Sequence, residues 1–194
     1  MRLRDGSRVR VRAIRPDDRQ PLAEAFQRLS PESRYRRFFT PMNQLSEGTL
    51  TYLTDVDHHD HEALVAFSED GGLVGVARYV RIDPDSPVAE AAITVSDDWQ
   101  GRGLARGLLH RLAARAREAG VAQFSALVKV ENPAAARVLR ELGPSELSRL
   151  GDEYRLLIDL PERGVGTKLT RALRAAAAGT LSLADTVARA AVRR

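Results

Sequence analysis

Residues 89–107, which read AEAAITVSDDWQGRGLARG, constrain the fold of this chain more than any other stretch. They place a short apolar strand, a glycine-rich turn and the first turn of an amphipathic helix directly one after another. In this order the unpaired N–H groups at the start of the helix converge, and the helix dipole adds positive potential. The stretch therefore predicts a strand–turn–helix unit with an anion-binding turn.

The turn itself, residues 100–105, reads QGRGLA. Its glycines let the backbone approach a ligand closely, and the small Ala105 leaves room inside the first helical turn. Arg102 is placed to add a charge-assisted contact to an anion. The turn lacks the Gly-Lys-Ser/Thr of a Walker A loop and the pattern of a dinucleotide-binding GxGxxG loop. We therefore expect it to hold a pyrophosphate in another way.

The hydrophobic periodicity of the remaining chain predicts a sheet with helices before and between its strands. Apolar runs indicate strands at residues 8–13, 63–68, 73–82, 89–95, 121–130 and 154–160. Proline and N-cap signals predict helices from about residue 16, after Ser30, after Ser46, at 101–119 and at 133–142. This order is typical of an α/β (α+β) fold, a mixed sheet with helices on both faces.

The composition narrows the classes of protein that this chain can represent. It carries no cysteine, which excludes disulfides, thiol nucleophiles and thiolate metal sites. Without an apolar leader or a run of about 18 apolar residues, we expect a soluble, cytoplasmic protein and no membrane span. The net charge of +4 rests on arginines interleaved with acids. No aromatic-basic module accompanies them, so we expect an anionic cofactor rather than a nucleic acid.

The chain is expected to contain one domain and an appendage. Residues 1–160 are expected to form the domain. Beyond Pro161 the composition shifts to Ala and Arg, and residues 161–194 are expected to form a helical extension, with short helices at 167–178 and 182–193. Such helices could dock on the domain, pair between subunits of a homo-oligomer, or lie on an anionic surface.

Two further segments admit more than one interpretation. Residues 33–40 combine aromatic and arginine side chains, which indicates either a helix packed by its aromatics or a wall of a ligand groove. Residues 57–62, reading DHHDHE, hold three of the four histidines. Their spacing matches no zinc pattern, so we expect no metal there. We expect instead a polar loop beside a substrate groove.

In its glycine-rich turn the chain resembles the GNAT N-acetyltransferases. The signature of that family is Gln/Arg-x-x-Gly-x-Gly/Ala after a strand, which Gln100, Gly103 and Ala105 match. A second family feature, a strand followed by Asn and a helix, is matched by residues 121–130, Asn132 and residues 134–143. The resemblance covers about residues 8–160. It implies a mostly antiparallel sheet of six to seven strands, with acetyl-CoA as cosubstrate.

The resemblance also implies how acetyl-CoA is held. Asn132 is expected near the thiol end of the cofactor while it caps the following helix. A bulge that splays residues 89–95 from residues 121–130 would open a slot where thioester and amine meet. The pantetheine arm is expected along Ile93, Thr94 and Val95, and the pyrophosphate on the turn formed by Gln100, Gly101, Arg102, Gly103, Leu104 and Ala105.

Acetyl transfer to an amine needs a base, because only the neutral amine attacks. Glu90 lies on the central strand, and the period of two puts it on the same face as Ala92 and Thr94. We expect its carboxylate to be partly buried, as suits a catalytic base. The chain is most similar to the bacterial Pat-type protein lysine acetyltransferases, in which a Glu on this strand is the general base. Residues 14–18 and 29–39 also look like segments of those enzymes.

One position departs from the family pattern. Many members carry a Tyr in the helix after the Asn, placed to protonate the departing thiolate, and that register falls on Leu139. Either water or a residue such as Tyr154 or Tyr35 supplies the proton, or the chain binds CoA without efficient turnover. The leading hypothesis is a protein lysine acetyltransferase. The alternatives are a small-molecule amine acetyltransferase and a CoA-sensing or partner-binding module with weak catalysis.

Overall fold

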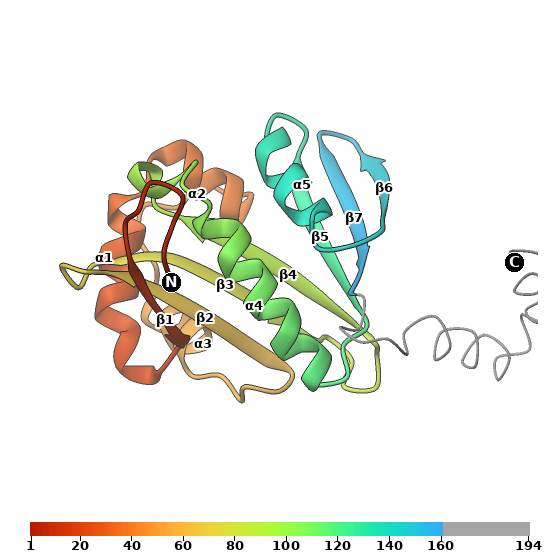
Figure 1. Ribbon diagram of the computed structural model, residues 1–194, viewed down its shortest axis with the longest axis horizontal. Coiled ribbons are helices and arrows are strands. Elements are labelled where there is room, and N and C mark those ends of the chain that lie inside the picture. The colour runs from red at the N-terminus through yellow and green to blue at the C-terminus, as the bar shows by residue number, and fades with distance from the viewer. Residues whose placement is uncertain (161–194) are drawn as a thin grey trace, which may run out of the picture. The chain divides into compact units, whose positions relative to one another are not determined.

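A seven-stranded sheet forms the centre of the computed structural model, which describes residues 1–160 (Figure 1). The spatial order is β1-β2-β3-β4-β5-β7-β6, and every neighbouring pair is antiparallel except β4 and β5. The helices predicted in residues 161–194, and the subunit pairing suggested for them, lie outside the described residues. The strands are β1 (Val9–Ala13), β2 (His61–Ser68), β3 (Leu73–Val80), β4 (Val88–Val95), β5 (Gln123–Lys129), β6 (Ser145–Leu150) and β7 (Glu153–Asp159).

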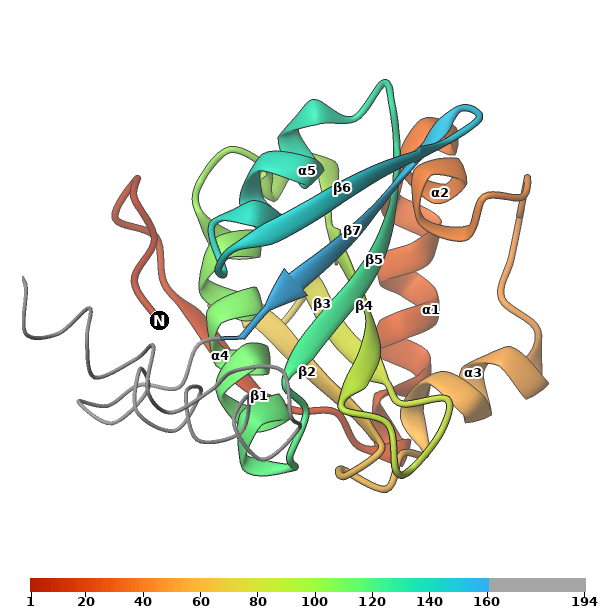
Figure 2. The same cartoon turned by 90° about the vertical axis from the view of Figure 1, so that its right-hand side faces the viewer.

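Helices cover both faces of this sheet, as the sequence predicts (Figure 2). On one face Leu22 and Leu53 pack with Val65, and on the other Leu108 packs with Tyr79. No helix within residues 1–160 has the length and apolar character needed to cross a lipid bilayer. The first face carries α1 (Arg19–Arg28), α2 (Pro31–Phe38) and α3 (Glu47–Thr54), and the second carries α4 (Leu104–Glu118) and α5 (Pro133–Arg140).

Three helices begin at the N-caps that the sequence indicates. The Ser30 hydroxyl accepts a hydrogen bond from the Ser33 N–H at 3.2 Å, and the Ser46 hydroxyl accepts one from the Thr49 N–H at 3.1 Å. The Asn132 side-chain oxygen accepts a hydrogen bond from the Ala135 N–H at 3.2 Å and caps α5. These bonds satisfy N–H groups that the first helical turn leaves unpaired.

The structure differs from the predicted elements at two points. The fourth helix begins at Leu104 rather than at residue 101, because Gly101 and Gly103 adopt left-handed conformations with φ of 73° and 87°. The strand β6 was not predicted. It is an edge strand that pairs with β7 alone, and five of its six residues are exposed. Such a strand carries no apolar periodicity, because neither of its faces is buried.

The two central strands β4 and β5 diverge (Figure 1). Their parallel pairing runs from Val88 opposite Gln123 to Glu90 opposite Ser125, while each strand continues to pair with its outer neighbour. The register between β3 and β4 is continuous to Val95, so the bulge that the sequence suggested on this strand is absent. The expected splay therefore arises because each strand follows its own antiparallel partner.

A buried ion pair fixes the corner between β1 and α1. The Arg12 guanidinium donates two hydrogen bonds of 2.6 Å to the carboxylate of Asp18, which also accepts from the Arg15 N–H at 2.8 Å. Arg12 lies over the ring of Phe67, at 4.7 Å from its centroid. Burial opposes ionisation of Asp18, but the hydrogen bonds from Arg12 and Arg15 outweigh it and lower its pKa.

Asp18→Asn is expected to lower the free energy of unfolding at pH 7 by about 2 to 3 kcal/mol, because Arg12 loses its counter-ion. The pKa of Asp18 is lower in the folded than in the unfolded chain. The ion pair therefore stabilises the folded protein at pH values above the ordinary Asp pKa of 3.8. This contribution is lost as the pH falls through the folded-state pKa. Urea unfolding between pH 7 and pH 3 should show the gap to wild type shrinking at acid pH. Asp17→Asn, at an exposed position, serves as control. A difference in the free energy of unfolding that did not change with pH would contradict a stabilising role of ionised Asp18.

Candidate active site

A groove of about 420 Å³ opens where β4 and β5 separate. Its walls are β4 with the turn that follows it, the end of β5 with α5, and part of α2. Arg102 is the predicted site residue that does not line the groove. The predicted residues that do line it are Glu90, Ile93, Thr94, Val95, Gln100, Gly101, Gly103, Leu104, Ala105 and Asn132.

The turn between β4 and α4 presents unpaired N–H groups to this groove. The first hydrogen bond of the helix runs from the Gly107 N–H to the Gly103 carbonyl at 3.1 Å, which leaves the N–H groups of Leu104, Ala105 and Arg106 without helical partners. Gln100 holds the turn in place by donating to the Val95 carbonyl at 3.2 Å. Backbone donors at the positive end of a helix dipole form an anion site, so this geometry fits a pyrophosphate.

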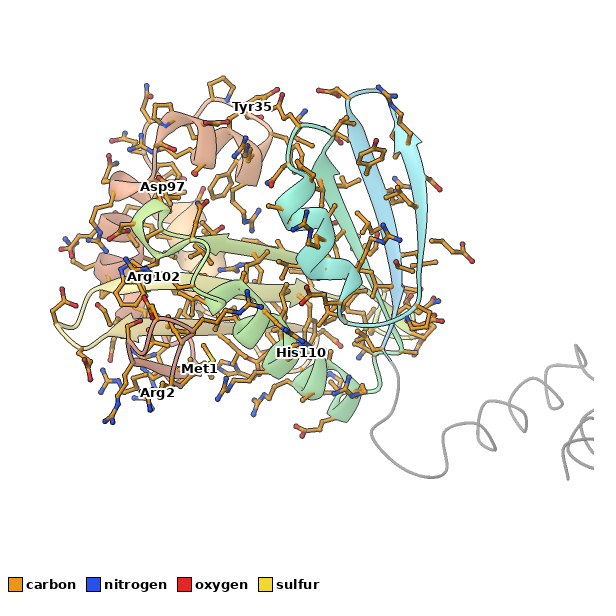
Figure 3. All side chains as sticks on the ribbon, turned by 45° about the horizontal axis from the view of Figure 1, so that its top comes forward. Met1, Arg2, Tyr35, Asp97, Arg102 and His110 are labelled. Atoms are coloured by element: carbon orange, nitrogen blue, oxygen red, sulfur yellow. The ribbon has the colours of Figure 1, made fainter. Side chains whose placement is uncertain are left out.

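Arg102 points away from the groove and is already engaged. Its guanidinium binds the Asp5 carboxylate at 3.1 Å and the Asp98 carbonyl at 2.6 Å, and it lies 4.9 Å from the ring centroid of Trp99. The first residues of the chain form an N-terminal hairpin, in which Arg2 and Arg8 pair antiparallel. Figure 3 shows Arg102 beside this hairpin. In this structure the Arg102 guanidinium is therefore engaged by Asp5 and does not line the groove.

A residue that sequence reasoning missed, Arg4, takes the expected place of Arg102. The Arg4 N–H donates to the Arg102 carbonyl at 3.1 Å, which attaches the N-terminal hairpin to the turn. The Arg4 side chain lines the groove, and a Cβ added at Gly103 would lie 3.4 Å from it. Arg106, in the first turn of α4, lines the same space. No local signal identified Arg4, because the contact joins segments far apart in the sequence.

Arg4→Ala is expected to weaken CoA binding about threefold to tenfold, because the turn loses a cation beside its anion site. The equivalent change at Arg2, which is exposed on the same hairpin, removes the same charge outside the groove and serves as matched control. Calorimetry with CoA and with pantetheine measures the effect, which should be confined to the phosphate-bearing ligand. An equal loss of affinity in the Arg4 and Arg2 variants, or for CoA and pantetheine, would contradict a direct contact between Arg4 and the phosphates of CoA.

The edge of β4 that faces β5 is free beyond Glu90. Because pairing with β5 stops there, the backbone from Ala91 onward lacks a partner strand on that side. A chain with amide groups, such as pantetheine, can bind this edge as an added strand would. Asn132 lies across the groove, and since its side-chain oxygen caps α5, its NH₂ group remains to donate to a ligand. The two roles expected of Asn132 are thus compatible.

Glu90 lies at the point where the two strands part. The register places Glu90, Ala92 and Thr94 opposite Val80, Arg78 and Val76, so the first three share one face, as predicted. The prediction of partial burial is wrong. Glu90 is exposed and lines the groove, at the last position where β4 pairs with β5. The negative charge of Glu90 acts on Arg37 of α2, which lines the same groove.

Leu139 occupies the position where the family pattern has a tyrosine. Its side chain is 3% exposed, belongs to the core and lines the groove, so it supplies no proton. Of the alternatives named from the sequence, neither Tyr35 nor Tyr154 lines the groove in the described chain. Neither tyrosine is therefore placed to donate a proton inside the groove.

The aromatic and arginine side chains in and directly after α2 do both things that the sequence left open. Some pack the helix against the core, and others line the groove. Phe38 packs edge-on against Phe26, with centroids 5.6 Å apart, while Arg37 and Phe39 line the groove.

Lys129 at the end of β5 contacts residues on both sides of the groove. It donates to Asp152 at 2.8 Å and Glu153 at 3.0 Å, which raises its pKa, and its ammonium lies 5.2 Å from the rings of Tyr35 and Phe39.

The histidine-rich segment is a structural corner rather than a loop beside the groove. The Glu62 carboxylate is fully buried, where it binds Arg115 of α4 at 2.7 Å and His58 at 2.8 Å. None of residues 57–62 lines the groove. Within residues 1–160, no cluster of His, Asp and Glu has the arrangement of a metal site.

Comparisons with known proteins place this geometry in a family. A family model described as an acetyltransferase (GNAT) domain matches residues 8–145. The chain is 36% identical over 143 residues to acetyltransferase PA5475 of Pseudomonas aeruginosa, covering 72% of this chain and 74% of that protein. It is 33% identical over 144 residues to acetyltransferase Pat of Mycolicibacterium smegmatis, covering 74% of this chain but 43% of that protein. The crystal structure of the GNAT domain of S. lividans PAT matches with a TM-score of 0.77 and 34% identity, over 82% of this chain and 95% of that one.

Proposed function

Because this chain belongs to the GNAT acetyltransferase family, we propose that it transfers the acetyl group of acetyl-CoA to the ε-amine of a lysine in another protein. It is an acetyl-CoA-dependent N-acetyltransferase whose family chemistry uses no metal. The protein acceptor, the cofactor contacts and the role of Glu90 belong to the proposal. The observation that carries it is the position of Glu90, exposed in the groove where β4 and β5 part.

The groove suits the two parts of acetyl-CoA that the protein must hold. The unpaired N–H groups of Leu104, Ala105 and Arg106 receive the pyrophosphate, with the positive charge of Arg4 beside them. The free edge of β4 receives the pantetheine arm around Ile93. The thioester then lies between β4 and β5, next to Asn132, where an amine can reach it from the α2 side.

Glu90 makes the acceptor nucleophilic. A lysine amine is protonated at neutral pH, and Glu90 accepts its proton, directly or through a water molecule. The amine nitrogen then attacks the thioester carbonyl carbon, and the C–S bond breaks when the tetrahedral intermediate collapses. The departing thiolate takes its proton from solvent, since Leu139 cannot donate one. The side-chain NH₂ of Asn132 is the polar donor available near this end of the groove.

A protein acceptor is favoured by two features. The exposure of Glu90 allows a lysine on a folded surface to reach it without threading through a closed tunnel. Of the two segments that resemble Pat-type protein lysine acetyltransferases, residues 29–39 contribute Ser33, Arg37 and Phe39 to the groove on the side of α2. The relative from M. smegmatis also carries the name Pat, although this chain spans 43% of that protein.

Acetylation of a cell lysate tests this proposal. The purified protein is incubated with acetyl-CoA and a lysate freed of small molecules, and acetyl-lysine sites are identified by mass spectrometry. We expect new sites that are absent with heat-denatured enzyme and with Glu90→Gln. If CoA thiol is released with polyamines or amino acids while no new acetyl-lysine site appears in the lysate proteins, the acceptor is a small-molecule amine and not a protein. Tight CoA binding without turnover on any amine would favour a CoA-sensing module.

A further inference from the structure

A second cavity, of about 50 Å³, adjoins the groove on the face of the sheet that carries α1, α2 and α3. Its walls are mostly apolar, but the basic residues Arg37 and Arg78 also line it. Because it shares Arg37, Ala92 and Thr94 with the groove, the two spaces are neighbours. A buried water needs about 10–15 Å³, so the cavity has room for about three or four water-sized groups, roughly a carboxylate and its methylene.

Arg78 is a buried cation whose hydrogen-bond partners carry no negative charge. Its side chain donates to the His61 Nε2 at 2.9 Å and to the Leu53 carbonyl at 3.1 Å, and the residue is 5% exposed. Burial, followed by the charge of Arg37, lowers the pKa of Arg78 to about 9, so it remains charged at neutral pH. Burial and then the charge of Arg78 lower the pKa of His61 to about 4, so His61 is neutral there.

Arg37 brings a second positive charge to the same cavity. It comes from α2 and lies over the ring of Phe38, at 4.9 Å from the centroid. Burial lowers the pKa of Arg37, and the negative charge of Glu90 partly opposes this effect. Within residues 1–160, no carboxylate lies within ion-pair distance of Arg37 or Arg78. Arg37 and Arg78 thus line this cavity without a carboxylate in ion-pair contact, and a buried charge without a counter-ion is costly.

The strand register leaves room beside these charges. Arg78 on β3 lies between Ala63 of β2 and Ala92 of β4, and both of these side chains are small. Glu90 cannot act as the permanent counter-ion of Arg37, because in the proposed reaction it takes up a proton and becomes neutral. A group that enters from the groove is therefore the remaining source of negative charge.

We propose that Arg37 and Arg78 bind a carboxylate of the acceptor, next to the amine that is acetylated. This inference rests on the proposed acetyl transfer and narrows its substrate class. An acceptor ammonium alone would meet two positive charges and be repelled, whereas a neighbouring carboxylate neutralises them through charge-assisted hydrogen bonds. The carboxylate is that of an Asp or Glu beside the acceptor lysine, or the α-carboxylate of a free amino acid.

Pairs of acceptors that differ in a single carboxylate test whether the protein prefers an acceptor with a carboxylate beside the amine. Peptides with one lysine are compared with Glu or Gln at each of the flanking positions, and free lysine is compared with lysine amide. We expect kcat/KM to be about tenfold higher for the best Glu peptide than for its Gln counterpart. Arg37→Gln should reduce this ratio to about one, and Arg37→Lys should keep part of it. Arg34→Gln, on the same helix but bonded to the Gln27 carbonyl outside both cavities, should keep the ratio. Equal loss on both peptides in Arg37→Gln would overturn the inference.

Binding of a carboxylate probe separates this inference from the proposed function. Calorimetry measures glutarate and the uncharged glutaramide against the protein saturated with CoA. We expect glutarate to bind wild type and Arg34→Gln but not Arg37→Gln, with no binding of glutaramide. If glutarate binds in this way while no peptide is acetylated, the carboxylate site stands and the protein acceptor fails. If glutarate does not bind and Glu and Gln peptides react equally, the carboxylate site fails and the acetyl transfer stands.

Discussion

Glu90→Gln is expected to lower kcat for amine acetylation by about 100-fold or more at neutral pH, because the acceptor ammonium loses the group that accepts its proton. Acetyl-CoA affinity should change by less than about twofold, since a carboxamide keeps the shape of the side chain and Glu90 lies outside the phosphate-binding turn. Thiol-release kinetics give kcat, and calorimetry with CoA gives the affinity.

The pH dependence sharpens this prediction. A lysine amine has a pKa of about 10.4, so the fraction that needs a base falls as the pH rises toward 10. The deficit of Glu90→Gln relative to wild type should therefore shrink between pH 7 and pH 10. Glu131→Gln is the matched control, because Glu131 is exposed and does not line the groove. Wild-type kcat in Glu90→Gln, or a deficit that does not change with pH, would show that another group removes the proton.

Gly103→Val is expected to weaken CoA binding by about 30-fold, which corresponds to ~2 kcal/mol. Gly103 caps α4 with a φ of 87°, a conformation that a β-branched residue adopts only with strain. Relief of that strain would rotate the N–H groups of the turn away from the pyrophosphate. The added side chain would also meet Arg4, which lies 3.4 Å from the Cβ position. Calorimetry with CoA measures the loss.

A second glycine separates the loss of binding from general backbone strain. Gly71, in the turn between β2 and β3, has the same φ of 87° and no atom within 4 Å of its Cβ position, and it does not line the groove. Gly71→Val should therefore lower the stability to thermal unfolding while CoA binding remains at the wild-type level. If both variants bind CoA equally well, the N–H groups of the turn do not hold the pyrophosphate.

The residues predicted correctly from the sequence share a local physical cause. Helix caps at Ser30, Ser46 and Asn132 are hydrogen bonds between a side chain and a backbone group three residues later, so the sequence alone determines them. The same holds for the glycine-rich turn, whose conformation follows from the residue types in it. The face shared by Glu90, Ala92 and Thr94 follows from the period of a strand.

Apart from the start of α4, which the glycines of the turn set locally, the corrections concern contacts between distant parts of the chain. Asp5 removes Arg102 from the groove and the N-terminal hairpin puts Arg4 there, although no sequence pattern links residue 4 to residue 103. Edge strand β6 has no buried face and thus no apolar period. Glu90 lines a groove because β5 leaves β4 just beyond it to follow β7, a feature of sheet pairing rather than of either strand.

The sequence by itself determined the strand–turn–helix unit of residues 89–107, because backbone conformation and capping depend on neighbouring residues. The type of chemistry was implied by the resemblance of its motifs to a family. Only the tertiary structure decided which charges meet there. It brought Arg4 to the turn that we propose to hold the pyrophosphate, and it placed Arg37 of α2 and Arg78 of β3 around one small cavity beside the groove. Charges act through space, and the distances between them are set by how helices and strands pack, which sequence spacing does not encode.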